Sequence, residues 1–587
     1  MHLMLVSLLS LSTLMFSPAR SFAAGGSSNL LRRSLISADT FRFQPSNTRL
    51  FTTRGGANQN DDSFPTWTFK EPCKTMDIND FPSTTISFVN SASSSSNSLK
   101  VSLVYGAEEE SDTPFSLPDD TDDAIKGIFN MHSEDFKNGT AAGASLPVIT
   151  LPSNSKLTLI SLGSSRSSSG HASAASKLAS SLAALASTHK PDTITITAPE
   201  AFTKDVKAMK TFTTNFYASL YTDNRYRFGD NAKNPFSKLE TVEFVTSSSS
   251  SSSSAAAVTL GTALETGASL TRDLVNSPPN VLNPLSMASV AKKIAQESGG
   301  CMKCKVMDAK ECEAMGMGAY LGVARGSETE PQFIHLTYTP PNKSNIKKKL
   351  AVVGKGLTFD AGGYNIKIAM MELMKFDMGG SGATLGAAKA CSLLKPENVE
   401  VHFIIASCEN MINEKAMRPG DILTASNGKT IEVLNTDAEG RLTLADALVY
   451  ADKTVGADKI IDLATLTGAC MIALGDGVAG VWSSDDDLAK ALTEGASGES
   501  GDKTWRMPLE ASYNDQLKSK IADMTNLGGK YGGAITAALF LQNFVDKKKP
   551  YAHIDIAGPV WDGKKGGATG FGAKLVSEWL LAEDKAE

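Results

Sequence analysis

Short apolar runs rich in β-branched residues alternate with longer segments of helical spacing along most of the chain. In the first half, five strand-like runs lie close to one helical segment. The runs cover residues 84–89, 100–104, 157–162, 193–197 and 241–245, and the helical segment covers residues 172–186. Strands that alternate with helices are typical of α/β domains. We therefore predict a small N-terminal α/β domain, in which we find no chemical motif.

A larger set of patterns begins with helical spacing at residues 260–275. We predict that this helix ends where Pro278 and Pro279 follow, because proline blocks continuation. Strand-like runs then cover residues 333–338, 349–353, 399–407, 430–434, 459–463 and 553–556, and helical patterns cover residues 381–394, 442–451 and 535–545. This order predicts a larger C-terminal α/β domain with a mostly parallel sheet flanked by helices.

A run of eight serines separates the two regions. Residues 247–254 are all serine, and such a stretch buries too little apolar area to fold by itself. We predict a linker or a surface loop here. It divides the chain into an N-terminal domain at residues 61–254 and a C-terminal domain at residues 255–587.

Residues 1–60 have the composition of a targeting presequence. The apolar run at residues 3–16 is shorter than the roughly 20 residues of a membrane span. Residues 25–60 carry five arginines and a single acid. A hydrophobic signal followed by an Arg/Ser-rich segment resembles the bipartite presequences of algae with secondary plastids. We predict a plastid location, with the mitochondrion or the secretory pathway as alternatives, and no other segment that spans a membrane.

Composition narrows the class of protein. With 41% hydrophobic and 20% charged residues, the chain has an ordinary globular mixture, which excludes disordered and collagenous proteins. A net charge of -6 gives no signal for nucleic acid. The seven cysteines are scattered and odd in number, which indicates a reduced compartment rather than a disulfide framework. Cys301 and Cys304 are the one close pair, without partners at zinc-site spacing.

Carboxylates follow the strands predicted in the second region. Asp360 comes after the run at residues 349–353, Asp377 precedes the helix at residues 381–394, and Asp437 and Glu439 come after the run at residues 430–434. Because reactive groups in open α/β sheets lie beyond the carboxyl ends of the strands, these four acids are candidates for one cluster. Crowded acids repel one another, and a bound cation relieves that repulsion.

The histidines narrow the choice of cation. All seven lack paired ligand spacing, so a metal here would have mainly oxygen ligands, which favours Mn, Mg or Zn. One arrangement of this kind holds two ions about 3.5 to 4 Å apart with a bridging water. With lysine and arginine nearby to stabilise an oxyanion, such a site points to hydrolysis of an acyl or phosphoryl group.

Other interpretations of the same residues stay open at this point. Asn435, Asp437, Glu439 and Asp446 imitate the ligands of an EF-hand calcium loop, although the run before them is strand-like rather than helical. Glycines around Lys355 suggest phosphate binding, but no Walker or dinucleotide-binding spacing is met.

The octapeptide Asn435-Thr-Asp-Ala-Glu-Gly-Arg-Leu442 matches the signature of the leucyl aminopeptidase (cytosol aminopeptidase) family. The chain resembles this family from about Thr271 to its C-terminus. Its residues 363–367 and 372–377 are most similar to the plant and algal branch. Five further motifs occur in the family's order: Val353-Gly-Lys-Gly-Leu-Thr-Phe-Asp360, Met374-Lys-Phe-Asp-Met-Gly-Gly380, Arg418-Pro-Gly-Asp421, Asp462-Leu-Ala-Thr-Leu-Thr-Gly468 and His553-Ile-Asp-Ile-Ala-Gly558.

The resemblance implies a two-metal site for Mn or Zn. Its ligands would be Lys355, Asp360, Asp377, Asp437 and Glu439. Asp360 and Glu439 would bridge both ions, and a bridging hydroxide would attack the carbonyl of the first peptide bond. A lysine ligates a metal only when it is neutral, so a nearby dication must depress its pKa.

The resemblance also assigns the catalytic and substrate-binding residues. Lys367 would stabilise the tetrahedral oxyanion, and Arg441 would hold a bicarbonate ion that acts as general base. The free amine of the substrate would bind a metal and Asp377. The first side-chain pocket would be apolar and suited to leucine, lined by Met374, Thr465, Gly468 and Ala557, with the carbonyl of Leu466 facing the substrate.

One segment departs from the family's pattern. Between Lys367 and Asp377 the chain is one residue shorter than the animal and bacterial pattern and shorter still than the plant one. The motifs on both sides are intact, so we expect metal binding to survive. The reach of Lys367 and the shape of the first pocket do not follow from the resemblance.

We predict a plastid-targeted, metal-dependent leucyl aminopeptidase that releases N-terminal Leu or Met from peptides in peptide turnover. The resemblance implies a homohexamer, a dimer of trimers whose inner cavity excludes folded proteins. The non-enzymatic alternative is a chaperone-like or binding protein on the same fold. A DNA-binding role, as in some bacterial relatives, is disfavoured by the net charge of -6. A metal-dependent phosphoesterase is the enzymatic alternative, and the complete motif set argues against it.

Overall fold

The computed structural model describes residues 73–92, 95, 97–105, 127, 142–145, 148–150, 156–163, 167–246 and 252–586. All of them belong to one compact unit, Thr68–Glu587. The predicted presequence at residues 1–60 lies outside the described residues, so it stays a prediction. In the part of the chain that the structure describes, no helix is long and apolar enough to cross a membrane.

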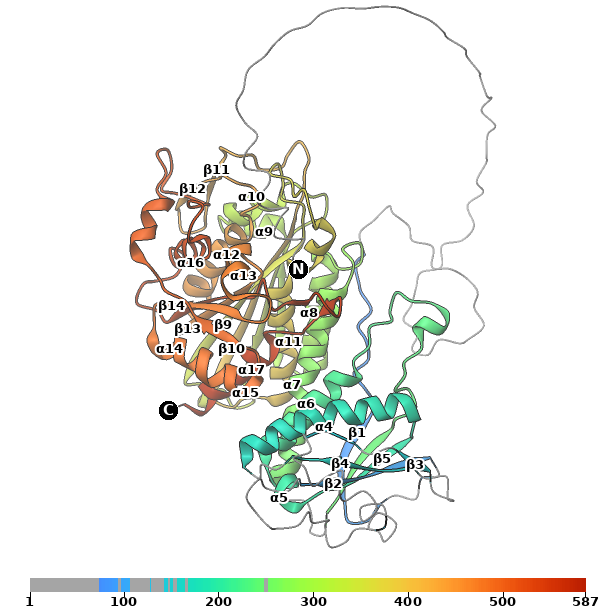
Figure 1. Cartoon of the computed structure of the whole chain (residues 1–587). Helices are drawn as coiled ribbons and strands as arrows, with labels where there is room; N and C mark the ends of the chain where they lie inside the picture. The colour runs from blue at the N-terminus through green and yellow to red at the C-terminus, as the bar shows by residue number, and fades with distance from the viewer. Residues whose placement is uncertain are drawn as a thin grey trace, which may run out of the picture. The chain divides into compact units, whose positions relative to one another are not determined.

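The first region folds around a six-stranded sheet, of which Figure 1 labels β1 to β5. The strand order is β1-β6-β5-β2-β4-β3. The first five strands in this order run parallel to their neighbours, and the two-residue β3 pairs antiparallel at one edge. The strands are β1 (Thr85–Val89), β2 (Ser98–Val104), β3 (Ile149–Thr150), β4 (Lys156–Ser161), β5 (Thr193–Thr197) and β6 (Thr241–Val245). All five predicted strands are therefore present.

Two long helices pack against this sheet, where the sequence predicted one. The predicted helix is α4 (Ser168–His189), and the missed helix is α6 (Val206–Leu220), preceded by the short α5 (Glu200–Thr203). Threonine and aromatic residues give α6 a weak intrinsic helix propensity. The helix forms because Asp205 caps it, accepting a hydrogen bond from the Ala208 N–H, and because Phe212 and Phe216 are buried in the core.

The second region folds around an eight-stranded sheet with the order β15-β14-β17-β13-β9-β10-β8-β7. Its four central strands, from β17 to β10, are parallel, while β8 and β14 run antiparallel to their inner neighbours. The strands are β7 (Met302–Met307), β8 (Gln332–Tyr338), β9 (Lys348–Asp360), β10 (Val399–Asn410), β13 (Lys459–Ala464), β14 (Ala479–Ser483), β15 (Thr504–Arg506) and β17 (Tyr551–Asp555). The prediction of a mostly parallel sheet is confirmed.

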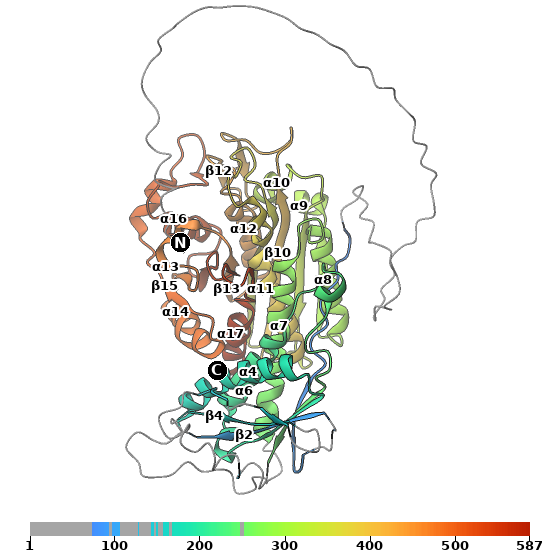
Figure 2. The same cartoon turned by 45° about the vertical axis from the view of Figure 1, so that its right-hand side comes forward.

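Helices on both faces of this sheet create two apolar cores (Figure 2). One core contains side chains of α7 (Ser252–Asn276), α8 (Pro284–Glu297), α11 (Gly379–Leu394) and α17 (Ala573–Lys585). The other contains side chains of α9 (Ala309–Ala314), α10 (Gly318–Ala324), α12 (Gly440–Val449) and α16 (Gly533–Gln542). The α/β class with helices flanking the sheet is therefore as predicted.

Shorter elements complete the second region. The helices are α13 (Gly468–Leu474), α14 (Asp486–Lys490) and α15 (Ser497–Ser500). In this region 3-10 helical segments occur at Lys343–Asn345, Met371–Phe376 (η3) and Ala511–Leu517, and π-helical turns at Tyr450–Val455 and Ala491–Ala496. A further 3-10 turn, Gly229–Ala232, belongs to the first region. A hairpin joins β18 (Trp561–Asp562) and β19 (Gly567–Ala568).

Two expectations about local structure are corrected. The strand expected at residues 430–434 is the shorter β12 (Thr430–Glu432), and it lies outside the main sheet. It pairs with β11 (Ile422–Thr424) and β16 (Met524–Thr525) in a separate three-stranded sheet. The serine run is also not wholly a loop, because its last three residues begin α7. Ser254 is buried there, and its hydroxyl donates to the Thr203 carbonyl. The predicted domain boundaries themselves stay a prediction.

Candidate active site

The centre of the candidate site lies where two neighbouring parallel strands end. Asp360 is the last residue of β9, and Asn410 is the last residue of β10 and its register partner. The Asn410 Nδ2 donates to Asp360 Oδ1 over 2.7 Å, and the Gly362 N–H donates to the same oxygen over 2.9 Å. The backbone and one amide thus fix the orientation of the Asp360 carboxylate, which is 2% exposed.

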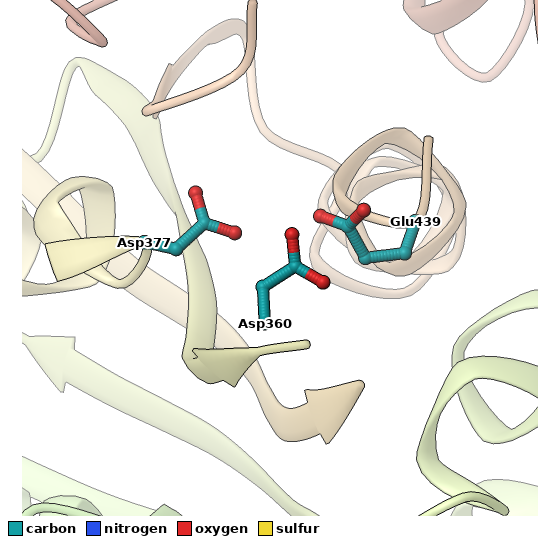
Figure 3. A group of neighbouring side chains, drawn as sticks. All are labelled: Asp360, Asp377 and Glu439. Atoms are coloured by element: carbon teal, nitrogen blue, oxygen red, sulfur yellow. The ribbon is translucent and has the colours of Figure 1, made fainter. Parts of the chain in front are cut away.

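Two further carboxylates reach this point from the N-terminal ends of helices. Asp377 comes directly before the N-cap residue of α11, and Glu439 is the N-cap residue of α12. The positive end of a helix dipole stabilises carboxylates at such positions. One oxygen each of Asp360, Asp377 and Glu439 lies within 4.8 Å of the others, as Figure 3 illustrates. All three side chains are buried.

Burial and repulsion within the triad disfavour the ionised forms of Asp360 and Asp377. Burial, followed by repulsion from Glu439, raises the pKa of Asp360 above its ordinary value. Burial also raises the pKa of Asp377 well above its ordinary value, and the attraction of Lys355 only partly offsets this rise. Three buried acids this close require positive charge between them if they are to stay ionised.

Lys355 supplies part of that positive charge. It lies in β9 with a side chain that is 3% exposed, and its Nζ is 2.8 Å from Asp377 Oδ2 and 3.0 Å from Glu439 Oε1. The same ammonium donates to the Thr465 carbonyl over 3.1 Å. Burial favours the neutral amine, but Asp377, Glu439 and Asp360 raise the pKa of Lys355 above its ordinary value.

Gly440 gives Lys355 the room that it needs. A Cβ atom built on Gly440 would lie 2.4 Å from Lys355 Cε and 2.6 Å from Nζ, which is closer than non-bonded atoms approach. Only glycine therefore allows the first turn of α12 to pack directly on the lysine. The glycine of the octapeptide thus has a steric role beside the acids that precede it.

Lys367 also contacts the acidic cluster. The family resemblance alone does not predict this contact, because the segment between Lys367 and Asp377 is shorter than in the family. The Lys367 Nζ lies 2.8 Å from Asp360 Oδ2 and 2.6 Å from Asp437 Oδ1. Met370, in the left-handed region at a φ of 54°, directs the chain into η3, and η3 then leads to Asp377. Asp437 lies at the open side of the cluster, with a side chain that is 33% exposed.

Arg441 is a buried cation with spare hydrogen-bonding capacity. It is 5% exposed, and neither its Nε nor its Nη1 has a hydrogen-bond partner among the described residues. Burial lowers the pKa of Arg441 to about 10, and Glu439 and Asp555 partly oppose this fall. Unpaired buried donors are costly, so this guanidinium is suited to hold an anion.

The predicted substrate-binding residues lie on three segments beside the cluster. Thr465 and Leu466 follow β13, and the Thr465 hydroxyl donates to Asp377 Oδ1 over 2.8 Å. Gly468 is the first residue of α13, Ala557 follows β17, and Met374 lies in η3. The structure thus links Thr465 directly to the acidic cluster. The roles of all these residues stay predictions.

Three asparagine and threonine residues that sequence reasoning missed hold the acids in place. Asn526 is fully buried and pins the loop before Glu439, since its Oδ1 accepts from Leu434 N–H and its Nδ2 donates to the Asn435 carbonyl. The Asn410 amide also donates to the Thr436 carbonyl over 3.0 Å, and the Thr436 hydroxyl donates to the Gly362 carbonyl over 2.6 Å. The position of Asn410 at the end of a buried strand was the one signal in the sequence.

The structure also brings together two histidines that have no paired spacing in the sequence. The Nε2 of His335 on β8 lies 2.9 Å from the Nδ1 of His402 on β10. The outer nitrogens contact Tyr450 and Glu400, at 3.1 Å each. The four groups form one linear chain of hydrogen bonds, so each ring nitrogen of the two histidines has a hydrogen-bond partner in the protein.

Comparison with known proteins places this geometry in context. Residues 269–577 match the catalytic domain of the cytosol aminopeptidase family. Leucine aminopeptidase 2, chloroplastic, from rice (Oryza sativa subsp. japonica) is 54% identical over 365 residues, which span 62% of this chain and 60% of the rice protein. A probable cytosol aminopeptidase of the cyanobacterium Picosynechococcus is 46% identical over 81% of this chain and 95% of its own length.

A solved structure has the same fold and a related sequence. A point variant of tomato leucine aminopeptidase superposes with a TM-score of 0.75 at 41% identity, covering 86% of this chain and 98% of the tomato chain. With these relatives, the fold and the site define a hydrolase of the aminopeptidase class. The chain belongs to the cytosol aminopeptidase family. The predicted family and the predicted class of enzyme are confirmed.

Proposed function

We propose that this chain is a metal-dependent leucyl aminopeptidase that hydrolyses the N-terminal peptide bond of peptides by a two-metal mechanism. The observation that carries the proposal is the buried triad of Asp360, at the end of β9, with Asp377 and Glu439, at the N-terminal ends of α11 and α12. Two lysine ammonium groups lie at the places where cations would balance these acids. A two-metal mechanism needs such a concentrated set of oxygen ligands to hold the divalent ions.

The residues present fit a pair of Mn or Zn ions. Lys355, Asp360, Asp377, Asp437 and Glu439 would hold them, as the family resemblance implies. Glu439 Oε2 is buried without a hydrogen-bond partner in the described part of the chain, so one ligand oxygen is still free. Bound divalent ions would lower the pKa of a water and polarise the scissile carbonyl.

Side chains of this protein would stabilise the oxyanion, hold the general base and bind the free amine of the substrate. The ammonium of Lys367, at the open side of the cluster beside Asp437, would donate to the oxyanion of the substrate. Arg441 would hold a bicarbonate that accepts the proton of the attacking water, which suits its unpaired Nε and Nη1. Asp377 would accept a hydrogen bond from the free N-terminal amine. This contact explains the removal of terminal residues only.

The first side-chain pocket and its surroundings set the class of substrate. Met374, Thr465, Gly468 and Ala557 would line an apolar pocket for leucine or methionine, and the Leu466 carbonyl would accept from the substrate backbone. We place the enzyme in peptide turnover within a plastid, supported by the chloroplastic rice relative. We further propose a homohexamer, in which an inner cavity admits short peptides with a free N-terminus.

Release of a chromophore from leucine p-nitroanilide tests the proposed function. The purified chain is assayed with added Mn or Zn, with a chelator, and as the Asp437→Ala variant. We expect metal-dependent turnover that is absent with the chelator, with N-acetyl-leucine p-nitroanilide and in Asp437→Ala. Turnover of the acetylated substrate at a similar rate would contradict the exopeptidase mechanism. A folded, metal-loaded chain without turnover would favour the binding-protein alternative.

A further inference from the structure

Asp555 is a buried carboxylate with no role in the proposed mechanism. It is the last residue of β17, at the carboxyl end of the eight-stranded sheet, and its side chain is fully buried. Burial raises the pKa of Asp555 above its ordinary value, so its position is electrostatically costly. Attraction to the neighbouring His553 and hydrogen bonds to the carboxylate offset part of this cost.

Those hydrogen bonds all come from two neighbouring loops. Asp555 Oδ1 accepts from the Leu466 N–H over 3.2 Å and from the Ala557 N–H over 3.1 Å. Asp555 Oδ2 accepts from the Thr467 hydroxyl over 2.6 Å. One carboxylate therefore ties the loop after β13 to the loop after β17.

The first of these loops also contacts the acidic cluster. The Thr465 hydroxyl donates to Asp377, and the Thr465 carbonyl accepts from Lys355. The next two residues along the chain, Leu466 and Thr467, are bound by Asp555. The loop is thus held at one end by the cluster and at the other by Asp555, and neither end can move without straining the other.

The bonded amides belong to residues that the proposed function places against the substrate. Leu466 would offer its carbonyl to the peptide, and Ala557 would line the first side-chain pocket. A carboxylate whose role is only structural could accept hydrogen bonds from loops that do not contact the substrate. Asp502 is such a carboxylate: it is buried and accepts from the N–H groups of Gly572 and Leu575, which the proposed mechanism does not use.

We propose that Asp555 is a positioning residue that sets the width of the first side-chain pocket and so the preference for leucine. This inference rests on the proposed function. By binding the Leu466 and Ala557 amides, Asp555 keeps the segment that carries the pocket residues Thr465 and Gly468 at a constant distance from Ala557. Loss of its oxygens frees both segments, and a large first side chain then loses its advantage over a small one.

The test compares Asp555→Ala, Asp555→Asn and the matched control Asp502→Ala in the full chain. Asp555→Ala removes all three acceptor bonds, whereas Asp555→Asn keeps one oxygen for the two amides. Thr467→Val removes the bond to Asp555 Oδ2 and also the cap that the Thr467 hydroxyl gives to the Cys470 N–H at the start of α13, and it serves if Asp555→Ala does not fold. The kinetic readout is kcat/KM for leucine, methionine and alanine p-nitroanilides, measured with bound metal counted in each variant.

We expect the leucine-to-alanine ratio of kcat/KM to fall about tenfold or more in Asp555→Ala. The loss should be mainly through KM for leucine, with partial rescue in Asp555→Asn, no change of the ratio in Asp502→Ala and unchanged metal content. A ratio that stays the same in Asp555→Ala and in Thr467→Val would overturn the proposal.

Hydrogen–deuterium exchange keeps this test separate from the proposed function. The amides of Leu466 and Ala557 should exchange faster in Asp555→Ala and in Thr467→Val than in Asp502→Ala, whether or not the chain turns over peptides. A catalytically inactive chain with this exchange pattern would contradict the proposed function but support the positioning role. Unchanged exchange at both amides would overturn the positioning role, even in an active enzyme.

Discussion

The two sheets of this protein share an architecture but differ in the residues at the ends of their strands. In the six-stranded sheet, the last residues of the parallel strands are Val89, Val104, Ser161, Thr197 and Val245. In the eight-stranded sheet, β9 and β17 end on Asp360 and Asp555, and β10 ends on Asn410. Both sheets are mostly parallel and both carry helices, yet among the described residues only the second one has carboxylates as the last residues of its strands. There Asp360 is joined by Asp377 and Glu439 from the N-terminal ends of α11 and α12.

This difference shows that the fold supplies the place and the terminal residues supply the chemistry. The first sheet has a core of aromatic side chains such as Phe212 and Phe244, and the residues at its strand ends bring no charge. The second sheet buries charged residues near the carboxyl ends of its central strands. There Lys355 of β9 pairs with Asp377, and Lys367 of the loop after β9 pairs with Asp360. Substitutions in the two regions should therefore have different consequences.

Loss of a central carboxylate should have the largest effect on activity. We expect Asp360→Asn to lower kcat on leucine p-nitroanilide by about a hundredfold to a thousandfold, because this residue forms an ion pair with Lys367 and lies within 4.8 Å of both other acids. The matched control is Asp446→Asn, another buried carboxylate, which accepts from Tyr320 and Ser426 amides outside the cluster. Equal losses in the two variants would mean that any buried acid of this region matters as much.

Steric displacement of Lys355 should come next. We expect Gly440→Ala to lower turnover about tenfold or more while the chain stays folded, because the new methyl group would meet Lys355 Cε at 2.4 Å. Gly498→Ala is the control, since a Cβ there meets no atom within 4 Å. Steady-state kinetics and circular dichroism of both variants check this prediction. Full activity of Gly440→Ala would show that the lysine does not need its present position.

A substitution in the first region should change stability and leave catalysis alone. Asp205→Ala removes the N-cap of α6, so we expect the free energy of unfolding to fall by about 1 kcal/mol. Urea unfolding and kcat/KM are measured on the same preparation. Loss of turnover in the folded variant would contradict the expectation that residues of the first region affect stability but not catalysis.

The histidine pair should give the smallest effect, a difference in acid sensitivity. Burial, followed by the neighbouring His402, lowers the pKa of His335 to about 3. The unfolded chain takes up this proton below about pH 6.5, so the contribution to stability should be complete above that pH and fall as the pH falls below it. We expect His335→Gln to flatten this dependence between about pH 7.5 and pH 5. Parallel curves for the two proteins, measured by thermal unfolding, would argue against a neutral His335.

The sequence predicted those parts of the fold and site that depend on local pattern. Strands with alternating or continuous apolar residues were found, and the acids Asp360, Asp377, Asp437 and Glu439 were candidates because they follow strands or precede helices. The three that the structure brings closest are Asp360, Asp377 and Glu439. Lys355 and Lys367 were singled out with them, and both contact the cluster.

The features that were missed depend on contacts between distant segments. The helix α6 has few strong helix formers and is stabilised by burial of Phe212 and Phe216, which no local pattern reveals. Asn526 holds a distant loop, with separations of 91 and 92 residues for its bonds to Asn435 and Leu434. Asp555 likewise acts across 89 residues on Leu466. An isolated Asn or Asp after a strand gives no hint of such a partner.

The central claim is that Asp360, at the end of β9, and the acids that join it from the segments before α11 and α12 hold two divalent ions. Equilibrium dialysis of the metal-free chain against Mn or Zn, followed by elemental analysis, tests this claim most directly. We predict two ions bound per chain, and at most one in Glu439→Gln, because Glu439 would contact both. A chain that binds no ion, or binds two equally well after the substitution, would contradict the account.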